Sequence, residues 1–226
     1  PPPQFAIIPA MTADLAPTRL CLVRHGETDW NAARRLQGHL DIPLNAVGHA
    51  QARQLARGLA QHAFAGCLCS DLSRTRQTVA PLLAHQPGLA VRYTPALRER
   101  HYGCFQGLTP DQARSQHPQA FTLLRSGPPD WRPEAGGESF ADHHARVMDC
   151  LNQLAAQASG HTWLVVTHGG VLDIIYRQVH RLPSSHPRNF PIPNAALNWL
   201  VHDASGWRIE HWADTRHLDG AALDEI

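Results

Sequence analysis

Short apolar runs alternate along the chain with segments in which apolar residues recur at helical spacing. The two clearest runs, Leu20–Val23 and Trp163–Val166, are typical of strands that are buried on both faces of a sheet. Shorter runs predict further strands at Cys67–Cys69, Val91–Tyr93, Leu197–Val201 and Trp207–Trp212. This alternation predicts an α/β fold in which helices cover both faces of one sheet.

Capping residues and prolines set the expected limits of the helices. Asn45 begins one helix, and the helix after the second strand is predicted to kink or end at Pro81. Thr109, followed by proline and aspartate, is a strong helix start, and Ser139 begins a long helix. Residues 126–137 hold three prolines and three glycines and are expected to be irregular.

Length and composition indicate one ordinary globular domain. The chain has 226 residues, of which 43% are hydrophobic and 17% are charged. Residues 18–226 are expected to form a single domain, and residues 1–17 a leader or an artificial extension, with Met11 a candidate natural start. No apolar run approaches the roughly 18 residues of a transmembrane helix, and the N-terminal segment lacks the pattern of a signal peptide.

Charge and cysteine content narrow the partners and the compartment. A net charge of +1 gives no sign of a nucleic acid or a membrane surface as partner. Five cysteines are an odd number and are scattered through apolar stretches, so we expect reduced core residues in a cytoplasmic protein. Any charge that matters for function must therefore be concentrated locally.

Two of the predicted strands end in the same way, at a histidine followed by glycine. They run into Arg24-His25-Gly26 and into Thr167-His168-Gly169. Open α/β sheets bind ligands beyond the carboxyl ends of their strands, so both histidines are expected at one edge. Glycine lets backbone N–H groups approach an anion closely, and a helix start after His168 favours negative charge. A lone histidine of this kind is usually a packed residue, but two of them favour a ligand site.

Two further segments add charged groups to this picture. Arg74 follows a short strand and begins a helix, where its planar guanidinium suits phosphate oxygens. Glu99 lies among the basic residues Arg98 and Arg100. Taken alone, each would be read as a solvated surface charge.

Together the four segments resemble the histidine phosphatase superfamily, also called the phosphoglycerate mutase-like family, from about residue 18 to residue 217. The resemblance implies a three-layer α/β/α sandwich with a mostly parallel sheet, and a nucleophile, His25, that becomes phosphohistidine. It implies that Glu99 protonates the leaving oxygen. The residues that it assigns to phosphate or substrate binding are Arg24, Asn31, Gln37, Gly38, Arg74, His168 and Gly169.

The chemistry of these residues needs no metal and no cofactor. Neutral imidazole is a good nucleophile, and fixed arginines can neutralise the charge of a phosphoryl group in transfer. A metallohydrolase built from the 16 histidines lacks a supporting ligand spacing. His143 and His144 are adjacent on a predicted helix and point about 100° apart, which suits a solvated face. The expected partner is a small phosphorylated metabolite.

Three functions stay open, of which a phosphatase is favoured. Fewer than thirty residues separate Gly107 from the Gly-Glu-Ser motif at 137–139, whereas mutases of the family have a long insertion there. The segment from Glu99 to Gly103, in contrast, looks like the mutase version. A silent phospho-ligand binder would be expected to have lost the histidines or Glu99. Sugar phosphates, a nucleotide-loop phosphate and phosphoglycerates are all candidate substrates, selected by residues 105–137 and the loop near Gln37.

Overall fold

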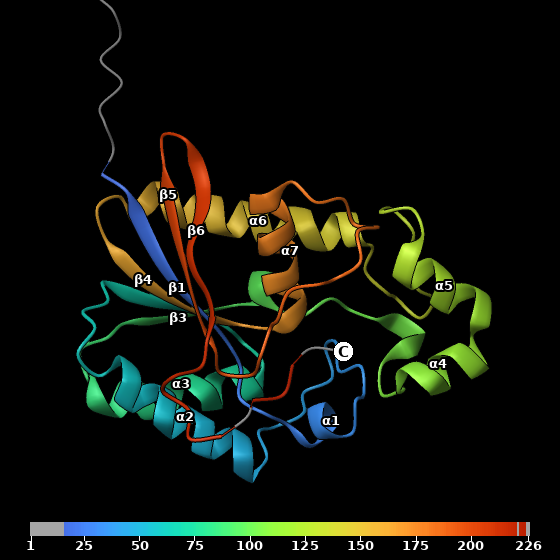
Figure 1. Ribbon diagram of the computed structural model, residues 1–226, viewed down its shortest axis with the longest axis horizontal. Coiled ribbons are helices and arrows are strands. Elements are labelled where there is room, and N and C mark those ends of the chain that lie inside the picture. The colour runs from blue at the N-terminus through green and yellow to red at the C-terminus, as the bar shows by residue number, and fades with distance from the viewer. Residues whose placement is uncertain (1–15, 221, 225–226) are drawn as a thin grey trace, which may run out of the picture.

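The computed structural model describes residues 16–220 and 222–224, so residues 1–15 of the expected leader lie outside the described residues. Its central sheet has six strands in the spatial order β3-β2-β4-β1-β5-β6 (Figure 1). In chain order, the strands are β1 (Thr18–Arg24), β2 (Gly66–Ser70), β3 (Val91–Thr94), β4 (Thr162–Thr167), β5 (Leu197–Asp203) and β6 (Gly206–Asp214). Strands β1 to β4 run parallel, and β5 and β6 are antiparallel to their neighbours. The prediction of a mostly parallel sheet is confirmed.

Helices form the two outer layers. The α-helices of the described residues are α1 (Asp29–Ala32), α2 (Ala46–Leu59), α3 (Ser73–His85), α4 (Pro110–Gln116), α5 (Pro118–Ser126), α6 (Phe140–Gln157) and α7 (Gly169–His180). Two short 3-10 helices are η1 (Pro95–Leu97) and η2 (Gly103–Phe105). Helices α2 and α3 cover one face of the sheet, α6 and α7 cover the other, and α4 and α5 lie to one side (Figure 1). Within the described residues, no helix is long and apolar enough to cross a membrane.

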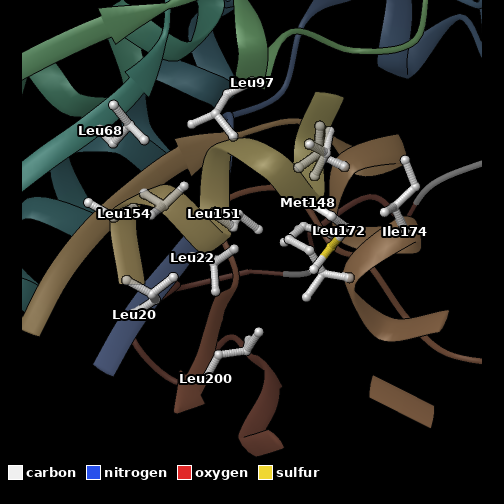
Figure 2. Packing of buried hydrophobic residues seen from close by; sticks show 14 of the residues in the cluster. Leu20, Leu22, Leu68, Leu97, Met148, Leu151, Leu154, Leu172, Ile174 and Leu200 are labelled. Carbon is white, nitrogen blue, oxygen red and sulfur yellow. The ribbon is translucent and has the colours of Figure 1, made fainter. Parts of the chain in front are cut away.

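Alternate residues of β1 pack on opposite faces of the sheet. Leu20 and Leu22 belong to the apolar core beneath α6 and α7, which Figure 2 shows from close by. Cys21 and Val23 belong to a second core against α2 and α3. Burying one leucine or valine side chain stabilises a fold by about 1.5–3 kcal/mol. A strand that fills two cores therefore reads as one continuous apolar run.

Caps start the helices where the sequence predicts, and of the two outcomes expected at Pro81, a kink or an end, the end is wrong. Asn45 accepts a hydrogen bond from the backbone N–H of Gly48, and Ser139 caps α6. Helix α3 does not end at Pro81 but continues to His85. Proline removes one backbone hydrogen bond in a helix interior. Burial of the helix against the sheet, at Leu82 beyond the proline among other residues, outweighs that loss.

The segment between the Glu99 loop and α6 forms a small separate cluster. Helix α4 begins after Thr109 as predicted, with Gln112 completing the capping box. Helix α5 was not predicted, and its Phe121 packs against Phe105 with ring centroids 6.1 Å apart. After α5 the chain is irregular up to the cap of α6, which confirms that prediction.

All five cysteines are free, as expected for reduced thiols. Cys21, Cys67 and Cys69 are buried between the sheet and its helices. Cys104 and Cys150 are only partly buried, so the expectation that all five lie in the core is wrong for these two.

Candidate active site

The register of β1 against β4 brings the two strand-end histidines together. Arg24 is paired with Thr167, and the backbone N–H of His25 donates to the carbonyl of Thr167 at 2.9 Å. The next residue after Thr167 is His168, whose ring centroid lies 5.2 Å from that of His25. Both side chains are buried, with 3% and 0% of their surfaces exposed. The predicted shared edge is thus present.

Hydrogen bonding fixes which nitrogen of His25 can react. Nδ1 lies 2.7 Å from the carbonyl oxygen of Gly26, and a carbonyl can only accept, so Nδ1 holds the ring proton. Nε2 then keeps its lone pair. Burial, followed by the charges of Arg74 and Arg24, holds the pKa of His25 well below its ordinary value of 6.5. The ring is therefore neutral near pH 7.

His168 is held between an arginine and a serine. Nε of Arg74 donates to Nδ1 of His168 at 3.2 Å, so Nε2 of His168 holds the proton and lies 2.8 Å from Oγ of Ser70. Burial, followed by the charge of Arg74, holds the pKa of His168 well below its ordinary value. The terminal nitrogens of Arg74 donate to the carbonyls of Gly38 and Leu40 at 2.8 and 2.9 Å. Arg74 thus also fixes the loop after α1.

One small cavity gathers most of the predicted site residues. Its lining residues are Arg24, His25, Asn31, Arg35, Leu36, Gln37, Arg74, Glu99 and Tyr102. The sequence predicts all of these as site residues except Arg35, Leu36 and Tyr102. Gly38 lies beside this cavity through its bond to Arg74, and Gly169 is the first residue of α7. Three of the four motifs therefore line the cavity, and the fully buried His168 of the fourth lies behind its lining, beside His25 and Arg74.

Asn31 reaches this cavity from α1, and Gln37 reaches it from the loop that follows α1. Oδ1 of Asn31 accepts from the backbone N–H of Thr28 at 3.0 Å in a capping box. That bond uses the oxygen of the amide and leaves its nitrogen as the group that can donate elsewhere. Oε1 of Gln37 is buried and has no hydrogen-bond partner among the described residues. A donor on a ligand would satisfy it.

Glu99 is bound through both carboxylate oxygens to backbone groups. Oε1 accepts from the N–H of Arg100 at 2.7 Å, and Oε2 accepts from the N–H of Gly170 at 2.9 Å. Gly170 lies in the first turn of α7. We expected the start of this helix to face the ligand anion directly. One of its N–H groups instead holds Glu99.

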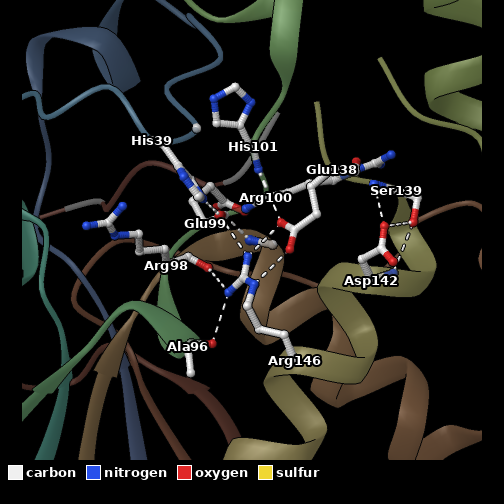
Figure 3. Close-up of polar contacts among 12 residues, drawn as sticks. His39, Ala96, Arg98, Glu99, Arg100, His101, Glu138, Ser139, Asp142 and Arg146 are labelled. Atoms are coloured by element: carbon white, nitrogen blue, oxygen red, sulfur yellow. Dashed lines mark hydrogen bonds and ion pairs between the residues drawn. The ribbon is translucent and has the colours of Figure 1, made fainter. Parts of the chain in front are cut away.

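A half-buried ion pair fixes the backbone around Glu99 (Figure 3). Arg146 on α6 donates to the carbonyls of Ala96, Arg98 and Glu99 at 2.9, 2.9 and 3.2 Å, and it pairs with Glu138 at 2.7 Å. Sequence reasoning missed this role of Arg146. A signal was present, since Arg146 directly precedes the core residue Val147 on α6 and cannot be wholly solvated there.

His143 contradicts the prediction of a solvated histidine pair. Only 2% of its surface is exposed, whereas His144 is partly exposed and lies 2.9 Å from Oε1 of Gln178. His143 precedes the core residues Val147 and Leu151 by four and eight residues, so helical periodicity puts it on the buried face. Among the described residues, no three His, Cys, Asp or Glu side chains are grouped to hold a metal ion.

Comparison with known proteins agrees with this geometry. The sequence profile of the histidine phosphatase superfamily (branch 1) matches residues 20–215. The chain belongs to this superfamily. It is 37% identical over 211 residues to a protein named probable phosphoglycerate mutase GpmB from Serratia proteamaculans, covering 91% of this chain and 97% of that protein.

Other relatives of this chain, itself a member of the superfamily, are named as phosphatases. It is 37% identical over 207 residues to the metal-independent phosphoserine phosphatase of Arabidopsis thaliana, covering 91% of this chain and 85% of that one. The solved structure of a mycobacterial glucosyl-3-phosphoglycerate phosphatase superposes with a TM-score of 0.76 at 31% identity, covering 88% of this chain and 100% of that one. The relatives thus include phosphatases and mutase-like proteins.

Three buried neutral histidines predict a loss of stability in mild acid. His25, His143 and His168 have pKa values well below 6.5 when folded, so below about pH 6.5 the unfolded chain binds more protons than the native state. The free energy of unfolding should fall with falling pH by up to about 1.4 kcal/mol per pH unit for each histidine. Urea unfolding between about pH 7.5 and 5.5 measures this slope.

Variants on α6 provide the control for this slope. His143→Met should reduce the slope by the contribution of one histidine, because one of the strongly shifted groups is lost. His144→Gln should leave it unchanged. Carboxylates with lowered pKa values, such as Asp71 and Asp214, lose their contribution only in stronger acid. A free energy of unfolding that is flat over this pH range would show that the histidines are not held neutral.

Proposed function

We propose that this protein hydrolyses small phosphomonoesters without a metal ion, through a phosphohistidine formed on Nε2 of His25. The observation that carries the proposal is the 2.7 Å contact between Nδ1 of His25 and the Gly26 carbonyl, which leaves Nε2 as the free nucleophile. Arg24 and Arg74 line the same cavity. A dianionic phosphoryl group suits a cavity with two guanidinium groups and a neutral nucleophile.

The reaction proceeds in two displacements. Nε2 of His25 attacks phosphorus as the bond to the leaving oxygen breaks, and Glu99 gives that oxygen its proton. Water then attacks the phosphohistidine, Glu99 takes a proton from the water, and the P–N bond breaks. Arg24, Arg74 and His168 stabilise the charge on the phosphoryl oxygens, with the contact between Arg74 and His168 yielding to the substrate.

The protein segments that enclose the candidate site favour hydrolysis over mutase action. A larger cavity of about 470 Å³ adjoins the phosphate cavity, and both are lined by Leu36 and Tyr102. Its outer wall is formed by α5 and by residues 184–188. The whole connection between Gly107 and α6 is short, so this wall leaves access for water to the phosphohistidine.

Arg100 suggests that the substrate has a second acidic group. It lines the larger cavity and is only 8% exposed, and Nε donates to the carbonyl of Glu138 at 2.8 Å. No described carboxylate forms an ion pair with its terminal nitrogens, and burial lowers the pKa of Arg100. A buried charge is costly unless it is paired. A substrate carboxylate would supply the partner, and phosphoserine and the phosphoglycerates both have one.

His25→Ala should abolish hydrolysis of p-nitrophenyl phosphate measured with excess chelator, because no other group in the cavity is placed as nucleophile. Glu99→Gln should slow hydrolysis of an alkyl phosphate by about 10²–10⁴-fold, the usual contribution of a general acid. His144→Ala, far from the reacting atoms, should keep wild-type activity. A His25→Ala enzyme as fast as wild type would remove the proposed mechanism, and loss of activity in chelator would remove its metal independence.

Mutase activity is tested with 3-phosphoglycerate, with and without 2,3-bisphosphoglycerate. Release of inorganic phosphate should outpace formation of the 2-isomer under both conditions, because water reaches the phosphoenzyme. Coupled detection of the 2-isomer beside phosphate release measures the two rates in one sample. Isomerisation that needs the bisphosphate and outruns hydrolysis would make the alternative, a phosphoglycerate mutase, correct.

Arg100→Met should raise KM by roughly 10- to 100-fold for phosphoserine and 3-phosphoglycerate, the loss expected for a charged hydrogen bond of about 1.5–3 kcal/mol. It should change KM for p-nitrophenyl phosphate, which has no second acidic group, by less than about twofold. Arg114→Met on the exposed surface of α4 is the matched control. Equal effects of Arg100→Met on all three substrates would mean that Arg100 does not select for a carboxylate.

A further inference from the structure

His143 is a buried histidine with an unused ring nitrogen. Its side chain is 2% exposed, and Nε2 is buried without a hydrogen-bond partner among the described residues. Leaving a buried polar group unsatisfied costs about 1–3 kcal/mol. Such a group is uncommon in a native core and calls for a partner that is present in another state of the protein.

The ring that bears this nitrogen lies near the Glu99 carboxyl group, on the other side of the Gly170 Cα. A methyl group built on Gly170 would come within 2.1 Å of Oε1 of Glu99 and 3.2 Å of Cε1 of His143. Both atoms are close to the same position, that of the added methyl carbon. The distance from Oε1 of Glu99 to Cε1 of His143 is therefore at most the sum of those two distances. Nε2 is bonded directly to Cε1. Only a residue without a side chain at position 170 lets the two groups approach in this way.

His143 is held in the neutral form that can accept a hydrogen bond. Burial, followed by the charges of Arg146 and Arg100, holds its pKa well below the ordinary value. The ring also contacts the backbone carbonyl of Arg98, which favours a proton on the nitrogen that faces it. Since Nε2 is the nitrogen without a partner, it is the one that keeps the lone pair.

We propose that His143 is a positioning residue for the proton of Glu99: Nε2 accepts a hydrogen bond from the carboxyl group when that group is protonated. The inference rests on the proposed role of Glu99 as the acid. Two backbone N–H groups, of Arg100 and Gly170, favour the ionised carboxylate. The lone pair of His143 favours the protonated form and orients its O–H. Because the backbone donors favour the carboxylate and His143 favours the protonated acid, neither form of Glu99 is strongly preferred. Glu99 can therefore give a proton in one step and take one in the next.

Among the groups around His143, its own Nε2 is the one that can accept a hydrogen bond from the Glu99 carboxyl group. On α6 its charged neighbour is Arg146, and from the Glu99 segment the Arg100 side chain and the backbone carbonyl of Arg98 face it. His39, from the loop after α1, and His168, before α7, complete the surroundings. The arginines are donors, and His168 uses both of its nitrogens with Arg74 and Ser70.

The test is the pH profile of kcat/KM for two substrates. Glycerol 2-phosphate has a leaving alkoxide that needs a proton, whereas p-nitrophenolate leaves without one. With glycerol 2-phosphate, His143→Leu should move the alkaline limb of the profile about one unit toward lower pH. With p-nitrophenyl phosphate the profile should move by less than about 0.3 unit. His143→Gln restores an acceptor and should bring the limb back toward wild type.

Controls separate this inference from the proposed function. His144→Leu on the neighbouring position of α6 should leave both profiles unchanged. An equal loss with both substrates at every pH in His143→Leu and His143→Gln would assign His143 a packing role only and overturn the inference. If Glu99→Gln hydrolyses glycerol 2-phosphate as fast as wild type, the acid role of Glu99 fails first. If Glu99→Gln is slow but His143→Leu keeps the wild-type profile, only the role of His143 fails.

Discussion

The parallel pairing of β1 with β4 is the constraint on which the candidate site depends. Because Arg24 is opposite Thr167, the next residue on each strand is a histidine at the same edge of the sheet. Apolar side chains on both faces of β1 lock this register, since a slip by one residue would exchange the two cores. The 5.2 Å spacing of the two rings is thus a consequence of core packing far from the site.

Buried positive charge is the second common feature. Arg24, Arg74 and Arg100 are all at most 8% exposed, and His25 and His168 are kept neutral beside them. Buried guanidinium groups lose their hydrating water, so such an arrangement is costly in the free protein wherever the charge is incompletely compensated. Under the proposed function, a phosphoryl dianion would reduce that cost when it binds. The burial that makes these charges costly is also what keeps His25 neutral.

The sequence predicts those parts of the molecule whose signals are local. Strands in apolar runs, caps such as Ser139, and histidines at strand ends can all be read from a few adjacent residues. Pro81 does not end α3, because tertiary burial outweighs a local backbone defect. His143 was misjudged because two adjacent histidines were treated as a pair, although the spacing to Val147 already placed one of them inside.

Contacts between residues that are distant in sequence and come together only in the folded protein could not be predicted from such local signals. Arg146 acts on three carbonyls more than forty residues away in sequence, and the wall at residues 184–188 reaches the cavity from beyond α7. In the proposed mechanism, these remote groups bear on the fate of the phosphohistidine. Glu99 would give a proton in one step and take one in the next, with its carboxyl group held by two backbone donors and with the ring of His143 nearby. Such a carboxyl group would serve water as the second acceptor as readily as a sugar acid, so the proposal assigns the difference between hydrolysis and mutase action to the access of water and not to the acid itself.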